Sequence, residues 1–357
     1  MNTLRDHGIT FGPFPTTEHN HISDIEGVAI GHKTLNEGKD IHTGITIIRP
    51  HEGDVVKENP FAGLYIGNGH GKAAGISQIE ELGTVESLLG LTSTFAVGTV
   101  LQELVRHHIK EQNDPDLITL NAFVGEINDC LLTNSASLPI RPEHVHEAIA
   151  DVHEYNFEQG AIGGGAGARS FGFKSGIGSS SRVVDARFTK SGESYKIGVL
   201  MQSNFGGFLR LKGKEIWETL GGQKFEEELK AINNSGGSCM ILIATDAPLL
   251  PGQLKRIAER CFASLTRVGS FIPLMCGDYA LAWSTAPQSR IYKDEERKLW
   301  THGPFLNDVA IDPIFAAAVD ATEEAFWNSM TTQIDVEGYR TTFNALTVEK
   351  ILDALKQ

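Results

Sequence analysis

The chain has 357 residues, of which 41% are apolar and 21% charged, the balance of a globular protein with a large buried core. Its formal net charge of −14 argues against a nucleic acid or an anionic membrane as a partner, because either surface would repel it. No apolar run approaches the roughly 18 residues that cross a bilayer, and the first residues lack the pattern of a secretion signal. The four cysteines contain no C-x-x-C pair, so we expect a protein of the reducing cytoplasm.

Strand and helix patterns alternate in the first half of the chain. Short apolar runs separated by glycine turns predict strands within residues 22–32 and 44–50. From Thr84 to Lys110, apolar residues recur at helical spacing, which predicts two helices or one broken helix. The glycine-dense stretch 163–167 lacks the Lys-Ser/Thr end of a P-loop, so a tight packing loop is favoured over a phosphate site. Presentation of its N–H groups to an oxyanion is the open alternative.

Further elements are expected in the second half. The expected strands cover residues 196–202, 239–245 and 279–285. The expected helices begin after Pro251 and cover residues 307–333 and 348–356. Because strand groups and helix groups do not alternate strictly, we favour an α+β fold. No repeat or linker marks a boundary, so residues 1–357 are expected to form a single domain or two interlocked halves.

A Gly-Ser step offers a candidate nucleophile. Residues 233–238 are small and polar and pass directly into the apolar run 239–245, which predicts a loop ending at the mouth of a buried strand. Gly237 permits backbone shapes that let the Ser238 hydroxyl attack the preceding carbonyl. The freed Ser238 α-amine, with an ordinary pKa of about 7.7 to 8.0, could then act as the base for its own hydroxyl. Taken alone, such a step is more often an ordinary turn.

Histidine pairs raise the question of a metal. The pairs are His19 with His21, His107 with His108, and His144 with His146. None forms an H-E-x-x-H or a comparable ligand set, so we expect surface residues and no bound metal.

Two acidic segments are further candidates. Glu126 follows an apolar run and could hold a substrate ammonium, although a helix N-terminal acid or a solvated loop charge is the plainer interpretation. Cys276 and Asp278 precede an apolar strand and could orient protons or could form a turn.

Several segments together resemble the DmpA-type aminopeptidase family, which includes L-aminopeptidase/D-amidases and β-peptidyl aminopeptidases. The resemblance runs nearly end to end, and its most specific parts lie in the second half of the chain. They are residues 163–167, 173–178, 181–184 and 237–238, followed by 244–251.

The resemblance implies a four-layer αββα fold, shared with ornithine acetyltransferases and similar to N-terminal nucleophile hydrolases. It implies self-cleavage at Gly237-Ser238 into parts 1–237 and 238–357, with Ser238 as nucleophile and no metal or cofactor. It also implies an oxyanion-hole role for Asn204, an acid near the nucleophile in Asp278, an amine anchor in Glu126, and a homotetramer. Short peptides, amino-acid amides and esters would be the substrates.

Two departures from the family pattern keep other functions open. Cys276 stands where a serine is common and is a weaker hydrogen-bond donor, and Leu131 stands where an aromatic residue is usual. One alternative is an acyltransferase of the ornithine acetyltransferase type, although those enzymes use a threonine nucleophile. The other alternative is an uncleaved, non-catalytic relative that binds a small amine.

Overall fold

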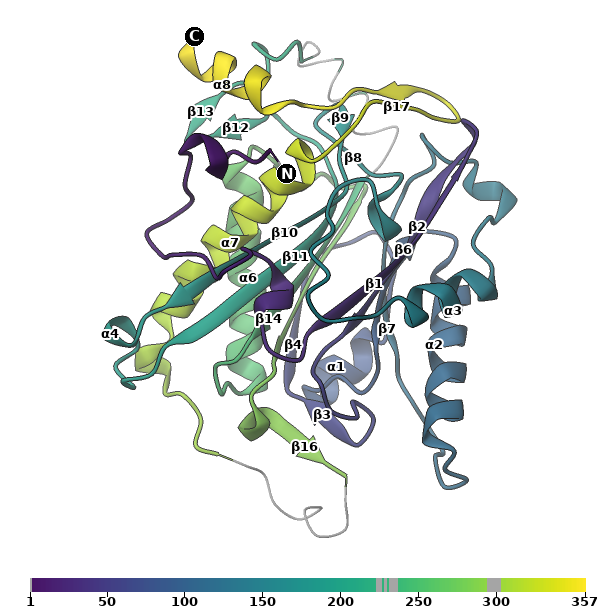
Figure 1. The fold of residues 1–357 in the computed structure, drawn as a ribbon, viewed down its shortest axis with the longest axis vertical. Helices are drawn as coiled ribbons and strands as arrows, with labels where there is room; N and C mark the ends of the chain where they lie inside the picture. The colour runs from purple at the N-terminus through teal and green to yellow at the C-terminus, as the bar shows by residue number, and fades with distance from the viewer. Residues whose placement is uncertain (1, 223–226, 228–229, 231–236, 294–302) are drawn as a thin grey trace.

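Two five-stranded sheets lie face to face, and helices cover their outer faces (Figure 1). The computed structural model describes residues 2–222, 227, 230, 237–293 and 303–357. The first sheet has the order β1 (Ala29–Glu37), β2 (Ile41–Arg49), β6 (Leu89–Ser93), β7 (Phe123–Ile127) and β5 (Ala73–Ala74). The second sheet has the order β10 (Ile177–Val184), β11 (Tyr195–Asn204), β14 (Gly237–Thr245), β15 (Cys276–Ser284) and β4 (Ala62–Gly69).

The main helices form the two outer layers. The first sheet is covered by α2 (Val97–Gln112) and α3 (Pro142–Ala150), and the second by α6 (Pro251–Arg267) and α7 (Asp312–Thr331) (Figure 1). The other α-helices within the described residues are α1 (Ile76–Leu82), α4 (Ala186–Thr189) and α8 (Val348–Lys356). The short strands are β3 (Glu58–Pro60), β8 (Arg169–Ser170), β9 (Phe173–Lys174), β12 (Arg210–Leu211), β13 (Lys214–Glu215), β16 (Arg290–Tyr292), β17 (Val336–Glu337) and β18 (Thr342–Phe343). The architecture is the expected four-layer αββα sandwich of the α+β class.

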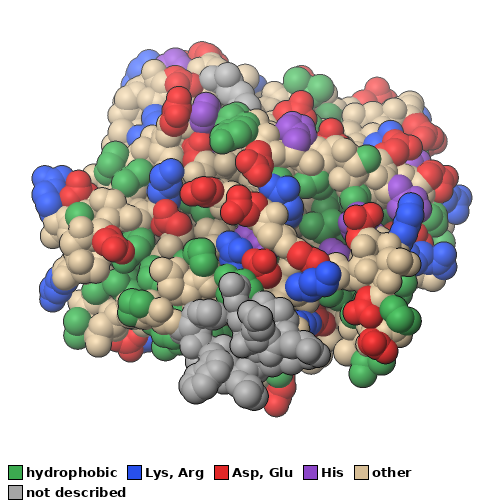
Figure 2. All heavy atoms as spheres, turned by 60° about the horizontal axis from the view of Figure 1, so that its bottom comes forward, with side chains coloured by type: hydrophobic (Ala, Val, Ile, Leu, Met, Phe, Trp, Pro, Cys, Tyr) green, Lys and Arg blue, Asp and Glu red, His purple; other side chains and the backbone are tan. Residues whose placement is uncertain are grey.

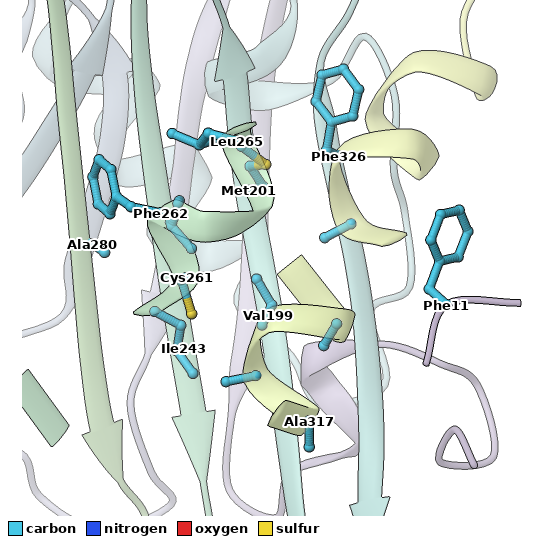
Figure 3. Close-up of a cluster of buried hydrophobic side chains, with 14 of the residues drawn as sticks. Phe11, Val199, Met201, Ile243, Cys261, Phe262, Leu265, Ala280, Ala317 and Phe326 are labelled. Carbon is cyan, nitrogen blue, oxygen red and sulfur yellow. The ribbon is translucent and has the colours of Figure 1, made fainter. Parts of the chain in front are cut away.

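Side chains of the second sheet alternate between two apolar layers. Along β14, Ile241 and Ile243 pack with α6 and α7, and Met240 and Leu242 pack between the sheets. Figure 3 shows the helix-side layer, in which Val199, Met201 and Ile243 of the sheet meet residues of both helices. The predicted apolar face of α6 lies in this layer and consists of Leu254, Ile257, Ala258, Cys261, Phe262 and Leu265.

The helix expected near residue 89 is wrong. Leu89–Ser93 is the strand β6 in the middle of the first sheet, and the helix α2 begins only at Val97. Leu89 and Leu91 face the other sheet and Leu88 faces the α2 layer. Because both faces are buried, apolar residues occur without strand alternation and imitate a helical pattern.

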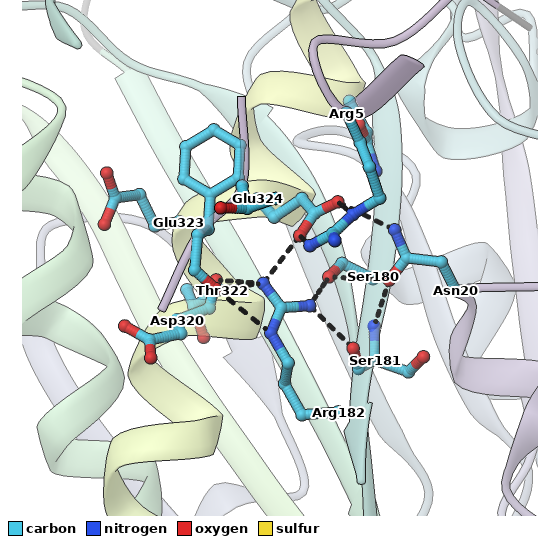
Figure 4. Close-up of polar contacts among 12 residues, drawn as sticks. Arg5, Asn20, Ser180, Ser181, Arg182, Asp320, Thr322, Glu323 and Glu324 are labelled. Carbon is cyan, nitrogen blue, oxygen red and sulfur yellow. Dashed lines mark hydrogen bonds and ion pairs between the residues drawn. The ribbon is translucent and has the colours of Figure 1, made fainter. Parts of the chain in front are cut away.

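A buried ionic network ties the early part of the chain to the late part. Arg182 of β10 and Glu324 of α7 are both buried, with 2.6 Å between Nη2 and Oε2. Arg5 forms a second ion pair with Glu324, and Asn20 donates to the same carboxylate at 2.8 Å (Figure 4). Although burial alone would raise the pKa of Glu324, its hydrogen bond with Arg5 and the charge of Arg182 lower it.

The surface in Figure 2 carries acidic and basic side chains interspersed with apolar ones. Among the described residues, no helix is long and apolar enough to cross a membrane.

Candidate active site

Ser238 is the second residue of β14, a strand flanked on both sides by other strands. Residues 233–236 of the predicted polar loop lie outside the described residues. The Ser238 hydroxyl donates a hydrogen bond to the Gly237 carbonyl oxygen at 2.6 Å and is buried. By the alternation along β14, Ser238 points into the space between the two sheets, with Met240. The hydroxyl therefore contacts the carbonyl group of the Gly237-Ser238 peptide bond.

Asn204 is the direct cross-strand neighbour of Ser238, because the last residue of β11 pairs with the second residue of β14. Its side-chain amide is held at both ends. Oδ1 accepts from the Arg169 backbone N–H at 3.0 Å, and Nδ2 donates to the Asn128 carbonyl at 3.0 Å. The amide is thus fixed on the inter-sheet face that also carries the Ser238 side chain.

Cys276 and Asp278 flank the same position from the neighbouring strand. In the parallel pairing of β14 with β15, Gly237 lies opposite Cys276 and Ser238 lies opposite Gly277. A Cβ built on Gly237 would be 2.9 Å from the Cys276 Sγ, so the thiol lies against the residue before Ser238. Burial, and secondly the charge of Asp278, raise the pKa of the Cys276 thiol to about 12.

Asp278 is a buried carboxyl with one unused oxygen. Its Oδ2 has no hydrogen-bond partner among the described residues, and burial raises its pKa to about 7. Both Cys276 and Asp278 alternate in step with Ala280, which packs on the helix side of the sheet. The segment from Cys276 to Asp278, predicted to form a turn or to orient protons, therefore begins the strand β15, so the turn is wrong. The side chains of Cys276 and Asp278 point away from the face that carries the Ser238 hydroxyl.

Glu126 lies in β7 and is only 2% exposed, so both plainer interpretations, a helix N-terminal acid and a solvated loop charge, are wrong. Oε1 accepts from the Lys72 N–H at 3.0 Å, and Oε2 has no partner among the described residues. Burial raises the pKa of Glu126, against the opposing effect of the bond from Lys72. Gly71 separates Glu126 from the nucleophile strands, since its added Cβ would be 2.9 Å from Oε1 and 2.7 Å from the Gly277 Cα.

Sequence reasoning missed the groups that support these residues. Asp129 is buried and accepts hydrogen bonds from Thr43, Ser93 and Ser135 at 2.6 to 3.0 Å. Asp129 follows Asn128, whose carbonyl holds the Asn204 amide. An acid shortly before the polar run 133–137 was the available signal, but only the fold shows that three hydroxyl groups donate to this carboxylate.

The glycine stretch is a packing loop. The Gly163 N–H donates to the Thr34 hydroxyl at 2.8 Å, and the Gly164 N–H donates to the Thr46 hydroxyl at 3.0 Å. A Cβ on Gly164 or Gly165 would lie within 2.8 Å of backbone atoms. These N–H groups are occupied, which argues against the oxyanion alternative for them.

The expectation that the histidine pairs are surface residues is wrong in part. His21 and His108 are buried, and burial lowers the pKa of His21 to about 3 and that of His108 to about 4. The other histidine of each pair, His19 or His107, is more exposed, and adjacent positions in a sequence do not show this difference. In the described ranges, no group of three or more His, Cys, Asp or Glu residues could hold a metal ion.

Leu131 is half-buried, and its carbonyl accepts from the Arg340 N–H at 3.0 Å. The departure at this position therefore lies beside the chain segment that contains β17 and β18.

Comparison with known proteins identifies the family of this chain. Residues 20–343 match peptidase family S58. The beta-peptidyl aminopeptidase BapA of Sphingosinicella microcystinivorans is 33% identical over 357 residues, covering 94% of this chain and 87% of that protein. A Burkholderia sp. beta-aminopeptidase has a similar structure, with 33% identity and a TM-score of 0.89 over 100% of this chain and 98% of that one.

A third similar protein is the L-aminopeptidase D-Ala-esterase/amidase of Ochrobactrum anthropi, described as a variant of the Ntn hydrolase fold. Its structure has a TM-score of 0.90 at 28% identity, covering 100% of this chain and 99% of that one. The match extends over both sheets and both helix layers. This chain therefore belongs to peptidase family S58 and is a serine hydrolase of the aminopeptidase and amidase type.

Proposed function

We propose that Ser238 is the nucleophile and that the chain activates itself by cutting the Gly237-Ser238 bond. The observation that carries this proposal is the hydrogen bond of 2.6 Å from the Ser238 hydroxyl to the Gly237 carbonyl. Attack of Oγ on that carbonyl carbon, with transfer of the hydroxyl proton to the departing nitrogen, turns the peptide bond into an ester. Water then hydrolyses the ester, leaving a carboxylate on Gly237 and a free amine on Ser238.

The mature site then uses the same hydroxyl on a substrate. The Ser238 amine accepts the hydroxyl proton as Oγ attacks the amide carbonyl, and it returns a proton to the leaving amine. Asn204 donates to the developing oxyanion from the same face of the sheet, in exchange for its bond to the Asn128 carbonyl. Water releases the acyl group and restores the hydroxyl.

Glu126 anchors the free amine of the substrate in this proposal. A buried carboxylate with an unpartnered oxygen, one glycine away from the nucleophile strands, supports the role. Together with the names of the relatives, this supports short peptides, amino-acid amides and esters as substrates, including peptides that begin with a β-amino acid.

The two parts of the cleaved chain would stay together. The strand β14 that begins the part 238–357 lies between β11 of the other part and β15 of its own. The Arg182–Glu324 ion pair also crosses between the parts (Figure 4). This arrangement supports the proposal that residues 1–357 form a single interlocked catalytic unit.

We further propose a cytoplasmic homotetramer. The family resemblance supports the assembly, and the four cysteines, all free of disulfides, support a reducing compartment.

Intact-mass spectrometry of the wild type beside Ser238→Ala tests the central proposal. We expect the wild type as two chains, 1–237 and 238–357, and the variant as one chain. A wild type that stays whole after prolonged incubation would favour the non-catalytic alternative. Assays of the mature protein with and without an added amine acceptor distinguish hydrolysis from acyl transfer.

A further inference from the structure

Lys174 is a buried lysine for which the described residues provide no acidic partner. It lies in β9 with none of its surface exposed, and in the described part of the chain no carboxylate forms an ion pair with it. Its Nζ donates to three backbone carbonyls, those of Ala168 at 3.0 Å, Gly165 at 3.4 Å, and Ser175. Burial lowers the pKa of Lys174 to about 7. Holding an ammonium in this position costs free energy, and packing alone would favour an apolar side chain.

One of these carbonyls shares a peptide group with a donor at the active site. The Ala168 carbonyl accepts from Lys174, and the N–H of the same peptide group belongs to Arg169. This N–H donates to the Asn204 Oδ1 at 3.0 Å. A cation on the carbonyl side of a peptide polarises the group and makes its N–H a stronger donor.

The Arg169 N–H decides which way the Asn204 amide faces. A side-chain amide has an acceptor end and a donor end, and a flip would place two donors against each other at Arg169. With Oδ1 on this N–H, Nδ2 faces the Asn128 carbonyl and the inter-sheet space. The amide therefore presents its donor end on the face that carries the Ser238 hydroxyl.

We propose that Lys174 is a positioning residue that orients and polarises the Asn204 amide through the peptide group between Ala168 and Arg169. This inference rests on the proposed oxyanion role of Asn204. Lys174 touches no substrate, and its contribution reaches the reaction only through Asn204.

The hairpin that carries Lys174 has its own anchor. The buried Phe171 has a positive φ of 52° in the turn between β8 and β9, next to Gly172 with φ 79°. The Phe171 ring packs against Phe205 and Phe326, with centroids 5.6 Å apart in both pairs. We therefore expect the hairpin to fold without the lysine.

A double-mutant cycle tests the inference. The proteins are the wild type, Lys174→Met, Asn204→Ala and the double variant, with kcat normalised to the fraction of cleaved chain and the half-time of self-cleavage as a second readout. We expect Lys174→Met to lower kcat about tenfold and to leave KM within about twofold of its wild-type value. In the Asn204→Ala background, the same substitution should change kcat by less than about twofold. Lys174→Gln, which keeps a donor, should recover part of the loss. Lys214→Met is the matched control, since this exposed lysine also donates to a backbone carbonyl.

The outcomes separate the two proposals. An equal loss from Lys174→Met in both backgrounds would overturn the positioning role while leaving Asn204 in place. An unchanged kcat and self-cleavage rate in Asn204→Ala would instead refute the oxyanion role itself. Failure of both Lys174 variants to fold would assign the lysine to the fold and also overturn the inference.

Discussion

Ser238 and Cys276 lie on neighbouring strands of one sheet, yet their side chains point to opposite faces of it. The hydroxyl faces the space between the sheets, with Asn204 beside it. The thiol lies against Gly237, the residue before Ser238. Variants at these two positions therefore change opposite faces of the same strand pair, and the proposed roles of the two faces can be tested separately.

Gly237→Ala should slow self-cleavage. An added Cβ would lie 2.8 Å from the Asn204 carbonyl oxygen and 2.9 Å from the Cys276 Sγ, so the start of β14 has to shift. We expect at least about a tenfold longer half-time of the intact chain, because a small misplacement of reacting atoms is costly. Mass spectrometry over time measures it. Gly98→Ala is the control, since its Cβ would meet no atom within 4 Å, and equal half-times in the two variants would contradict the prediction.

Cys276→Ser should speed self-cleavage. A hydroxyl donates a stronger hydrogen bond than a thiol whose pKa is raised to about 12 by burial. We expect the half-time of conversion after refolding to fall severalfold. The control is Cys130→Ser, which changes a half-buried thiol outside the β14–β15 pair. A half-time that is unchanged or longer would show that the thiol of Cys276 does not slow self-cleavage.

Glu126→Gln should impair catalysis and leave maturation intact. The variant keeps the shape of the side chain but removes the charge that would hold a substrate ammonium. We expect kcat/KM for substrates with a free amine to fall by about 10- to 100-fold, the value of a charge-assisted hydrogen bond. Self-cleavage uses no substrate amine, so its half-time should change less than about twofold. If both readouts fall together, Glu126 supports the structure of the site and does not anchor the substrate.

Asp278→Asn should flatten the dependence of stability on pH. The folded-state pKa of Asp278, about 7, lies above its ordinary value of 3.8. Between these values the folded chain keeps a proton that the unfolded chain has released, so this carboxyl lowers the stability as the pH rises through the window. Asparagine removes the effect. We therefore expect the free energy of unfolding of the variant, relative to that of the chain with Asp278, to rise by up to about 1.4 kcal/mol per pH unit from pH 4 to 7.

Urea unfolding in the Ser238→Ala background measures this gain on a single chain. The matched control is Asp353→Asn, at a carboxylate whose side chain is 69% exposed. A stability difference that does not change with pH would contradict the raised pKa of Asp278.

The sequence predicted the second sheet better than the first. The strands around residues 199, 241 and 281 and the helix after Pro251 show clear apolar runs or an amphipathic face, so they were predicted correctly. The strand β6 was missed, because burial on both faces removes the alternation that identifies a strand.

The site was predicted as a set of residues but not as an arrangement. The family resemblance pointed to Ser238 and Asn204, and the structure pairs these two residues across β11 and β14, while their catalytic roles stay predictions. The face on which Cys276 lies depends on strand register, and the burial of Glu126 depends on a sheet edge formed by distant segments. Lys174 was visible only as a basic residue within a motif of small residues, and its three carbonyl partners exist only in the folded hairpin.

The unpartnered Oδ2 of Asp278 implies a change in this carboxyl when the chain is cleaved. Among the described residues no ion pair involves Asp278, and burial raises its pKa to about 7, so a large share of this carboxyl is protonated at neutral pH. Scission before Ser238 would create an ammonium on the adjoining strand. In the cleaved chain the Ser238 ammonium would thus be a counter-ion for Asp278. The precursor and the mature protein would then differ in the protonation of this carboxyl as well as in one covalent bond.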